Sequence, residues 1–187
     1  CICGLFDHLE AFHPGSTLLG FRGGLRGVLR NSFTKLEAAT VERHRNSGGF
    51  FMIGSGGDLI ETEEELALAV RIARNNSLDG LVIIGGSASN ANACLLAERF
   101  AAEGLAARVV GVPKSVDGHL KSEQVELPVG FDSASKLYSE LVGNVMTDCT
   151  SSRKYYHFVR LMGRDASHLA LEVALRTRPN LVLLGEE

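Results

Sequence analysis

The chain has 187 residues, 45% of them hydrophobic, and a formal net charge of -3. This length and apolar content allow a substantial core, and so small a charge argues against nucleic acid as a partner. No apolar run approaches the roughly 20 residues that a membrane-spanning helix needs, and the first residues show no signal-peptide pattern. We therefore expect a cytoplasmic globular protein of one domain or slightly more, with neither nucleic acid nor membrane as a partner.

The four cysteines, Cys1, Cys3, Cys94 and Cys149, have no C-x-x-C spacing. They therefore form no recognisable zinc site, and reduced thiols are expected. The chain begins without methionine and stops just past an apolar run. We expect it to be a piece of a longer protein.

Five apolar runs rich in β-branched residues and without helical period predict buried strands at 50–53, 81–84, 108–112, 157–161 and 181–184. Helices are predicted between several of them, at 62–75, 89–104, 133–148 and 167–177. Thr62 and Glu65 form a capping box for the first helix, and Leu137, Leu141 and Val145 form the apolar stripe of the third. Alternating strands and helices indicate a mostly parallel α/β sheet, doubly wound so that helices cover both faces.

Ligands of parallel sheets collect in the loops at the carboxyl ends of strands, here 54–58, 85–90 and 111–119. Gly85 and Gly86 precede a helix that begins near Ser89. Two glycines let backbone approach an anion, and the helix start supplies N–H donors, so the loop suits a phosphate. A plain tight turn is the alternative.

The loop that follows the third predicted strand carries Pro113, Lys114 and Asp117. Lysine holds phosphate as a point charge, and an aspartate at a strand end can accept a proton from a hydroxyl. Because Asp-Gly is also a common turn dipeptide, Asp117 as a turn residue is the alternative.

The fourth predicted strand ends near Gly163, and Arg164 lies where a guanidinium could grip phosphate. A solvent-facing arginine is the alternative. His157, within an apolar run, is expected to be a hydrogen-bonded core histidine.

Taken together, these stretches resemble the phosphofructokinase family, and its long, pyrophosphate-dependent branch most. The motifs that carry the resemblance are G-G-x-x-S-N at 85–90, P-K-x-x-D-G at 113–118, G-F-D at 130–132, K-Y-Y-H-F at 154–158, M-G-R at 162–164 and G-E-E at 185–187. The resemblance implies a Rossmann-like three-layer sandwich for 1–146 and the beginning of a second α/β domain at 147–187. It also implies a glycolytic transferase that moves a phosphoryl group from pyrophosphate or ATP to the 1-hydroxyl of fructose 6-phosphate with magnesium.

The resemblance assigns roles to individual residues of this chain. Asp117 matches the general base, with Lys114 as its catalytic partner at the donor phosphate. The remaining donor phosphate positions are Gly85, Gly86 and Ser89. The substrate positions are Ser115, Val116, Asp117, Lys154, Tyr155, Met162, Gly163 and Arg164. Lys154 and Tyr155 match residues that reach into a neighbouring subunit, which implies a homo-oligomer or a homologous catalytic copy as partner.

Four positions depart from the family pattern, all on the donor and metal side. Ser87 replaces the magnesium aspartate, Ala88 an aspartate typical of pyrophosphate users, His119 a second acid and Gly57 an arginine. No intact metal ligand set is therefore expected, although magnesium is expected for the family. Three hypotheses stay open: a phosphofructokinase with weak catalysis, a non-catalytic regulatory or scaffold domain that binds fructose phosphate beside an active copy, and an unrelated nucleotide-binding α/β domain.

Overall fold

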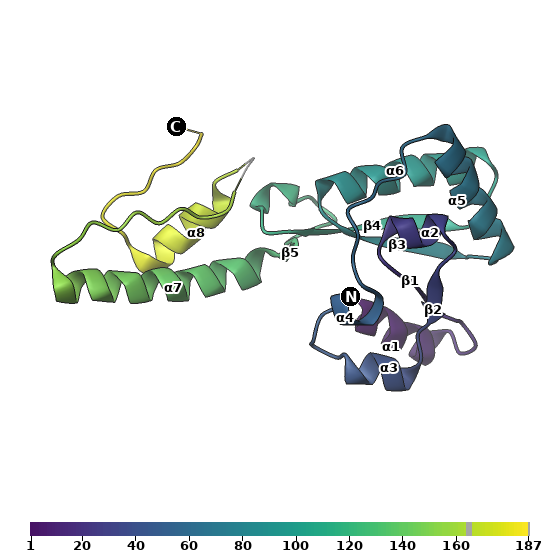
Figure 1. Cartoon of the computed structure of the whole chain (residues 1–187), viewed down its shortest axis with the longest axis horizontal. Helices are drawn as coiled ribbons and strands as arrows, with labels where there is room; N and C mark the ends of the chain where they lie inside the picture. The colour runs from purple at the N-terminus through teal and green to yellow at the C-terminus, as the bar shows by residue number, and fades with distance from the viewer. Residues whose placement is uncertain (164–165, 187) are drawn as a thin grey trace. The chain divides into compact units, whose positions relative to one another are not determined.

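The computed structural model describes residues 1–163 and 166–186 (Figure 1). It divides into two compact units, one made of Cys1–Val82 with Ala91–Val110 and the other of Ile83–Asn90 with Gly111–Glu187. The domain boundary predicted between residues 146 and 147 lies inside a helix of the second unit and stays a prediction. No helix among the described residues is both long enough and apolar enough to cross a bilayer.

The first unit is mainly helical and contains one small antiparallel sheet. Its elements are α1 (Ile2–Phe12), β1 (Leu19–Phe21), α2 (Leu25–Leu29), β2 (Phe33–Lys35), α3 (Ala38–Arg43), α4 (Phe50–Ile53), α5 (Glu63–Asn75) and most of α6 (Ser87–Ala102). β1 and β2 pair with Gly20 opposite Thr34. A Cβ at Gly20 would lie 2.5 Å from Ile53 Cγ2, so α4 lies directly on β1 at a glycine.

The predicted strand at 50–53 is wrong, because these residues form α4. The N–H of Gly54 donates to the carbonyl of Phe50 at 2.8 Å and closes a single turn. Gly54 ends that turn with φ 73°, a conformation that glycine adopts without strain. An apolar run this short has no measurable period, so composition alone cannot separate a helical turn from a strand.

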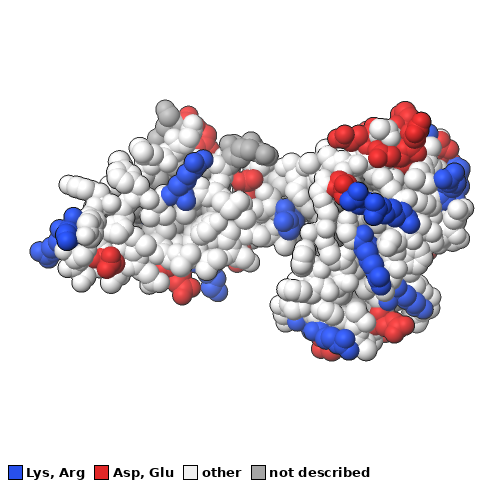
Figure 2. Space-filling view, viewed as in Figure 1, with Lys and Arg blue, Asp and Glu red and all other residues white. Residues whose placement is uncertain are grey.

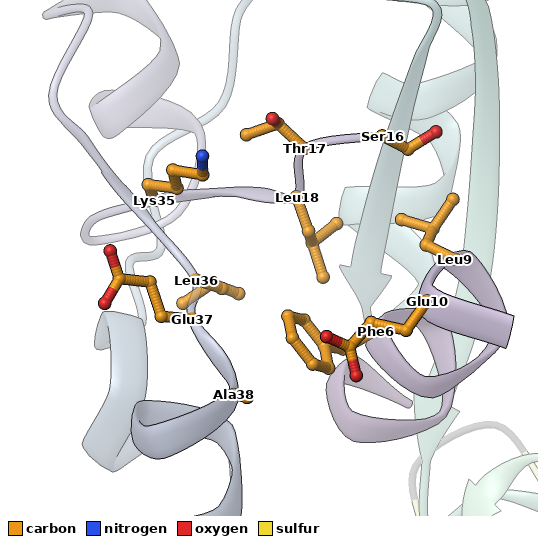
Figure 3. A pocket seen from close by; sticks show the side chains of 10 residues that line it. All are labelled: Phe6, Leu9, Glu10, Ser16, Thr17, Leu18, Lys35, Leu36, Glu37 and Ala38. Carbon is orange, nitrogen blue, oxygen red and sulfur yellow. The ribbon is translucent and has the colours of Figure 1, made fainter. Parts of the chain in front are cut away.

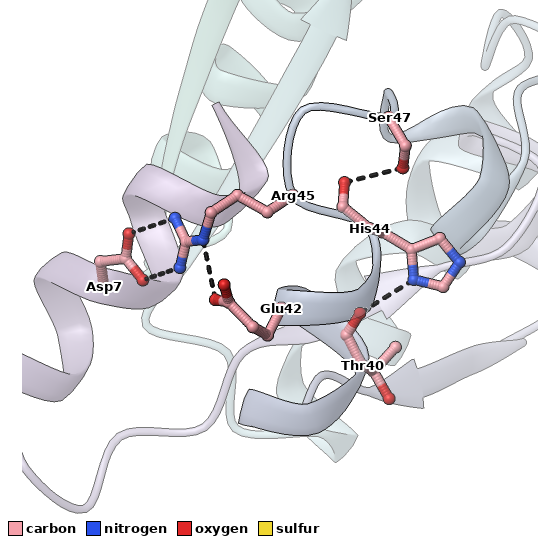
Figure 4. Close-up of polar contacts among 6 residues, drawn as sticks. All are labelled: Asp7, Thr40, Glu42, His44, Arg45 and Ser47. Carbon is pink, nitrogen blue, oxygen red and sulfur yellow. Dashed lines mark hydrogen bonds and ion pairs between the residues drawn. The ribbon is translucent and has the colours of Figure 1, made fainter.

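An ion-pair clasp joins α1 to the segment after α3 (Figure 4). Arg45 donates to the two carboxylate oxygens of Asp7 at 2.9 and 3.0 Å, and its Nε donates to Glu42 at 2.8 Å. These hydrogen bonds from Arg45 lower the pKa of Asp7. These ion pairs are exposed, and exposed ion pairs contribute little to stability. The packing of α1 against α3 therefore depends mainly on the buried side chains of Phe6 and Val41.

Helix α5 begins as predicted. Thr62 Oγ1 accepts from the Glu65 N–H at 3.2 Å, and the Glu65 carboxylate accepts from the Thr62 N–H at 3.1 Å. The apolar face of α5 is buried and includes Leu66, Ala69, Val70 and Ala73. Figure 2 shows acidic side chains gathered over the first turn of α5. Negative charges at this end stabilise the helix, because the helix dipole is positive there.

Helix α6 is joined to the segment before α5 by a buried amide. Asn92 is 5% exposed, and its Nδ2 donates to the carbonyl of Ile60 at 2.6 Å while its Oδ1 accepts from the Ile60 N–H at 3.1 Å. Both backbone groups of Ile60, a residue with no exposed surface, are therefore satisfied by one side chain.

The second unit contains the end of a three-stranded sheet with the order β3 (Gly80–Gly85), β4 (Arg108–Ser115) and β5 (Val129–Gly130). β4 and β5 are parallel. The chain then forms η1 (Gly118–Leu120), α7 (Phe131–Ser152) and α8 (His168–Thr177), and α7 packs against α8. The predicted strands at 81–84 and 108–112 and the α/β class with a parallel sheet are confirmed.

The predicted strands at 157–161 and 181–184 are wrong, because both segments are irregular. Tyr156 and Phe158 are 96% and 95% exposed, and His157 is exposed rather than in a core. β propensity describes side chains that fit a half-buried pleated surface, but a strand also needs a neighbour that pairs with its backbone. Among the described residues neither segment has such a neighbour.

Helices α6 and α7 differ in detail from the prediction. α6 begins at Ser87, two residues before the predicted start, and α7 extends beyond the predicted range at both ends. Leu137 and Leu141 of α7 are 54% and 52% exposed, so the predicted stripe is not the buried face. Instead α7 buries Ser135 and Val142, because the packed α8 lies against that side.

We predict that Asn92→Ala lowers the free energy of unfolding by about 3 kcal/mol, because two buried backbone groups of Ile60 lose their partners. Urea unfolding followed by circular dichroism measures the loss. Asn76→Ala is the control: its half-buried amide donates to Asn31 at 2.8 Å and to the Ile72 carbonyl at 2.9 Å, and the expected loss is about 1 kcal/mol. Equal losses in the two variants would contradict the role of Asn92.

Candidate functional site

The site lies where β4 ends. Lys114 and Ser115 are its last two residues and pair in parallel with Val129 and Gly130 of β5. Gly130 has φ 114°, and a Cβ there would lie 3.2 Å from the Ser115 carbonyl oxygen. Glycine at this position therefore allows the close strand pair and the immediate start of α7 at Phe131. The P-K-S and G-F-D stretches consequently lie side by side.

Asp117 is anchored to Ser115 by two hydrogen bonds. Ser115 Oγ donates to Asp117 Oδ2 at 3.1 Å and accepts from the Asp117 N–H at 3.1 Å. Both residues are half-buried, as is Val116 between them. Asp117 keeps extended dihedrals and stands directly before η1, which begins at Gly118. The arrangement holds one carboxylate at the carboxyl end of β4 with a defined orientation.

The loop between β3 and α6 is tight because it contains two glycines. A Cβ at Gly85 would lie 2.5 Å from the Cβ and Oγ of Ser89, so only glycine fits beside the first turn of α6. Ser87 is the first residue of that helix, which presents its free N–H groups at this loop. This is the local geometry expected of an anion site at a helix start.

Asn90 fastens the same loop, a role that the sequence analysis missed. Its Nδ2 donates to the carbonyls of both Gly85 and Gly86 at 2.9 Å. The signal was the asparagine at the end of G-G-x-x-S-N, since a side chain one helical turn after a glycine can reach back to it. A Cβ at Gly86 would lie 3.9 Å from the Lys114 carbonyl oxygen, so the structure brings the Gly85–Gly86 loop beside the end of β4.

A second hydrogen-bonded arrangement joins the start of α8 to the G-E-E stretch. The Ser167 N–H donates to Glu186 Oε1 at 2.6 Å, and Ser167 Oγ donates to Glu186 Oε2. The Gly185 N–H donates to Ser167 Oγ at 3.3 Å. These hydrogen bonds from Ser167 lower the pKa of Glu186. The sequence analysis took Ser167 only as a helix start, and its pairing with Glu186 is a tertiary contact.

The remaining predicted substrate residues lie on exposed chain. Lys154 Nζ is 5.2 Å from the Tyr155 ring centroid, and Tyr155 is 62% exposed. Met162 is also exposed, and Gly163 has φ 153°. No hydrogen bond between described residues joins this group to the Asp117 loop. Arg164 lies outside the described residues.

The side chains that the structure describes do not by themselves form a magnesium site. Within 1–163 and 166–186, no three His, Cys, Asp or Glu side chains are grouped so that they could hold a metal ion. At the loops described above, Ser87 offers a hydroxyl and Asp117 the carboxylate, whereas magnesium prefers carboxylate and phosphate oxygens in octahedral geometry. Gly57, which the resemblance matches to an arginine, borders open space among the described residues.

A separate hollow of about 250 Å³ lies in the first unit (Figure 3). Its apolar floor includes Phe6, Leu18 and Leu36, and Lys35 and Glu37 stand at its rim. None of the predicted site residues lines it.

A comparison with known protein families decides the identity. The phosphofructokinase family model matches residues 8–187. The chain belongs to the phosphofructokinase family.

Relatives and a solved structure agree with this assignment. The chain is 53% identical over 186 residues to pyrophosphate--fructose 6-phosphate 1-phosphotransferase subunit beta 2 of Arabidopsis thaliana. It is 51% identical to pyrophosphate--fructose 6-phosphate 1-phosphotransferase of Treponema pallidum. All of this chain aligns with 33% and 32% of those proteins, so it spans about a third of their length. The pyrophosphate-dependent phosphofructokinase from Marinobacter aquaeolei aligns with all of this chain over 49% of its own length, at TM-score 0.75 and 18% identity, and so shows a shared fold.

We predict that Ser115→Ala accelerates hydrogen exchange of the Asp117 amide by about fivefold, since a net hydrogen bond is worth about 1 kcal/mol. Amide exchange followed by NMR measures the change. Ser115→Thr keeps the hydroxyl and is expected to retain the wild-type rate. Unchanged exchange in Ser115→Ala would show that Ser115 does not anchor Asp117.

Proposed function

We propose that the full-length protein transfers a phosphoryl group from pyrophosphate to the 1-hydroxyl of fructose 6-phosphate. The single observation that carries the proposal is the Asp117 carboxylate, anchored by Ser115 where the Gly85–Gly86 loop meets the end of β4. The 53% identity to a pyrophosphate--fructose 6-phosphate 1-phosphotransferase supports the choice of donor and acceptor. Family membership removes the hypothesis of an unrelated nucleotide-binding domain.

In the proposed reaction Asp117 accepts the proton of the 1-hydroxyl, and the sugar oxygen forms a bond to one phosphorus of pyrophosphate. The bond from that phosphorus to the bridging oxygen breaks, and orthophosphate leaves. Lys114 neutralises charge on the transferred group, and the Gly85–Gly86 backbone with the start of α6 holds the donor phosphates. Positioning and charge neutralisation are what phosphoryl transfer asks of a protein.

Magnesium is expected from family membership, but no step is assigned to it because the described side chains do not form its site. The sugar phosphate is proposed to bind at Met162, Gly163 and Arg164. Lys154 and Tyr155 are proposed to serve a neighbouring copy, and their exposed positions leave them accessible to one. A cytoplasmic homo-oligomer, or a pair with a homologous catalytic copy, completes the proposal.

We predict that Asp117→Asn lowers kcat by about 10³-fold with little change in KM, because the amide cannot accept the hydroxyl proton. The measurement is a coupled assay of the full-length protein with fructose 6-phosphate, magnesium and either pyrophosphate or ATP. Asp148→Asn, on an exposed turn of α7, is the matched control and is expected to behave as wild type. Full turnover in Asp117→Asn would refute the base assignment.

A second candidate function is a non-catalytic domain that binds fructose phosphate beside an active copy. It is favoured by the residue at the start of α6, where Ser87 supplies a hydroxyl in place of the family carboxylate. His119 and Gly57 likewise lack the charges of the family pattern. Fructose 6-phosphate binding by calorimetry, without turnover on either donor, would support this function over the first.

The two functions are separated further by a gain-of-function variant. We predict that Ser87→Asp raises turnover and lowers the magnesium concentration needed for half-maximal rate, since a carboxylate binds the ion better than a hydroxyl and is favoured in a first helical turn. Ala91→Asp, further along the same helix and exposed, is the control for added charge and is expected to give no gain. Equal rates in Ser87→Asp and wild type would show that position 87 does not limit metal binding.

A further inference from the structure

The start of α8 is held firmly by contacts that the proposed reaction does not use. Glu186 accepts from both the N–H and the hydroxyl of Ser167, and the Gly185 N–H donates to that hydroxyl. A carboxylate at a helix start also stabilises the helix through its dipole. α8 buries Leu169 and Val173, at 1% and 2% exposure, in its packing with α7. The first residue of α8 is therefore held in place by the hydrogen bonds at the helix start and by the packing of the helix against α7.

That first residue, His168, lies against the loop of the proposed base. A Cβ at Gly118 would lie 2.8 Å from His168 Cβ, 3.0 Å from its Cγ and 3.3 Å from its Nδ1. Gly118 does not have a positive φ, so its backbone conformation suits other residues. Glycine is consequently required at position 118 because the His168 side chain occupies the space that a Cβ would fill. Gly118 directly follows Asp117, so His168 lies next to the loop of the proposed base.

We propose that His168, held by the contacts between Ser167 and Glu186, is a positioning residue that fixes Asp117 for proton transfer. This inference rests on the proposed function. Ser115 holds Asp117 by two hydrogen bonds, and His168 packs against the next residue, Gly118. A base held by both contacts keeps the geometry that general base catalysis requires, and small displacements are costly in rate.

A double-variant cycle tests the contact in the full-length protein. Gly118→Ala adds the methyl group that meets His168, and His168→Gly removes all three atoms near it. Each single variant is expected to lower kcat by about tenfold or more while KM for fructose 6-phosphate changes less than twofold, because the base is displaced and the sugar phosphate contacts are not. The double variant is expected to be no slower than His168→Gly alone. Losses that multiply in the double variant would overturn the proposal.

Hydrogen exchange of residues 117–120 provides a readout that does not need activity. Ser167→Ala and His168→Gly are expected to speed exchange there, and Ser167→Thr, which keeps the hydroxyl, is expected to restore the wild-type rate. Glu172→Gln, which breaks the exposed pair with Arg176 at 2.8 Å on the same helix, is the control for α8 stability and is expected to leave residues 117–120 unchanged. Unchanged exchange in Ser167→Ala and His168→Gly would overturn the proposal, as would faster exchange with unaltered kcat. If the wild-type protein has no turnover, the proposed function fails, and the exchange experiment still decides whether His168 positions the loop.

Discussion

Ser115 ends β4 opposite Gly130 of β5, and this parallel pair determines where the side chains that follow are placed. Beyond it the chain leaves the sheet, so the Asp117 carboxylate stands clear of the ladder yet stays tied to Ser115 by two hydrogen bonds. α7 begins directly after Gly130, and α8 packs on α7. The contact of α8 with the Asp117 loop therefore depends on the same strand pair.

Close backbone approach at glycines recurs around this pair. Gly85 accommodates the first turn of α6, Gly130 the Ser115 carbonyl and Gly118 the His168 side chain. At each of these positions an added Cβ would lie closer to a neighbouring atom than ordinary van der Waals contact allows. These glycines bring three segments of the chain together at the carboxyl end of β4, where parallel sheets collect ligands.

The charges around the site are sparse on the side proposed for the donor. Lys114 supplies a cation and Asp117 a carboxylate, and Ser87 at the start of α6 carries no charge. Phosphoryl transfer depends on charge neutralisation. The residues at these few positions therefore bear on whether the proposed site catalyses the transfer or only binds its ligand. The M-G-R motif, which is proposed to bind the sugar phosphate, is complete in the sequence.

Local patterns alone determined several features of this protein. The Thr62–Glu65 capping box and the strands at 81–84 and 108–112 were predictable because their signals lie within a few residues of chain. β4 continues through Pro113, Lys114 and Ser115, which the local pattern placed in the loop after the strand. The motifs likewise indicated the family. Only the tertiary structure decided that 157–161 and 181–184 are irregular, that α7 buries Val142 rather than Leu137, and that His168 occupies the space at Gly118. Each of these depends on a partner far away in sequence, and propensity carries no information about which partner packs against a given face.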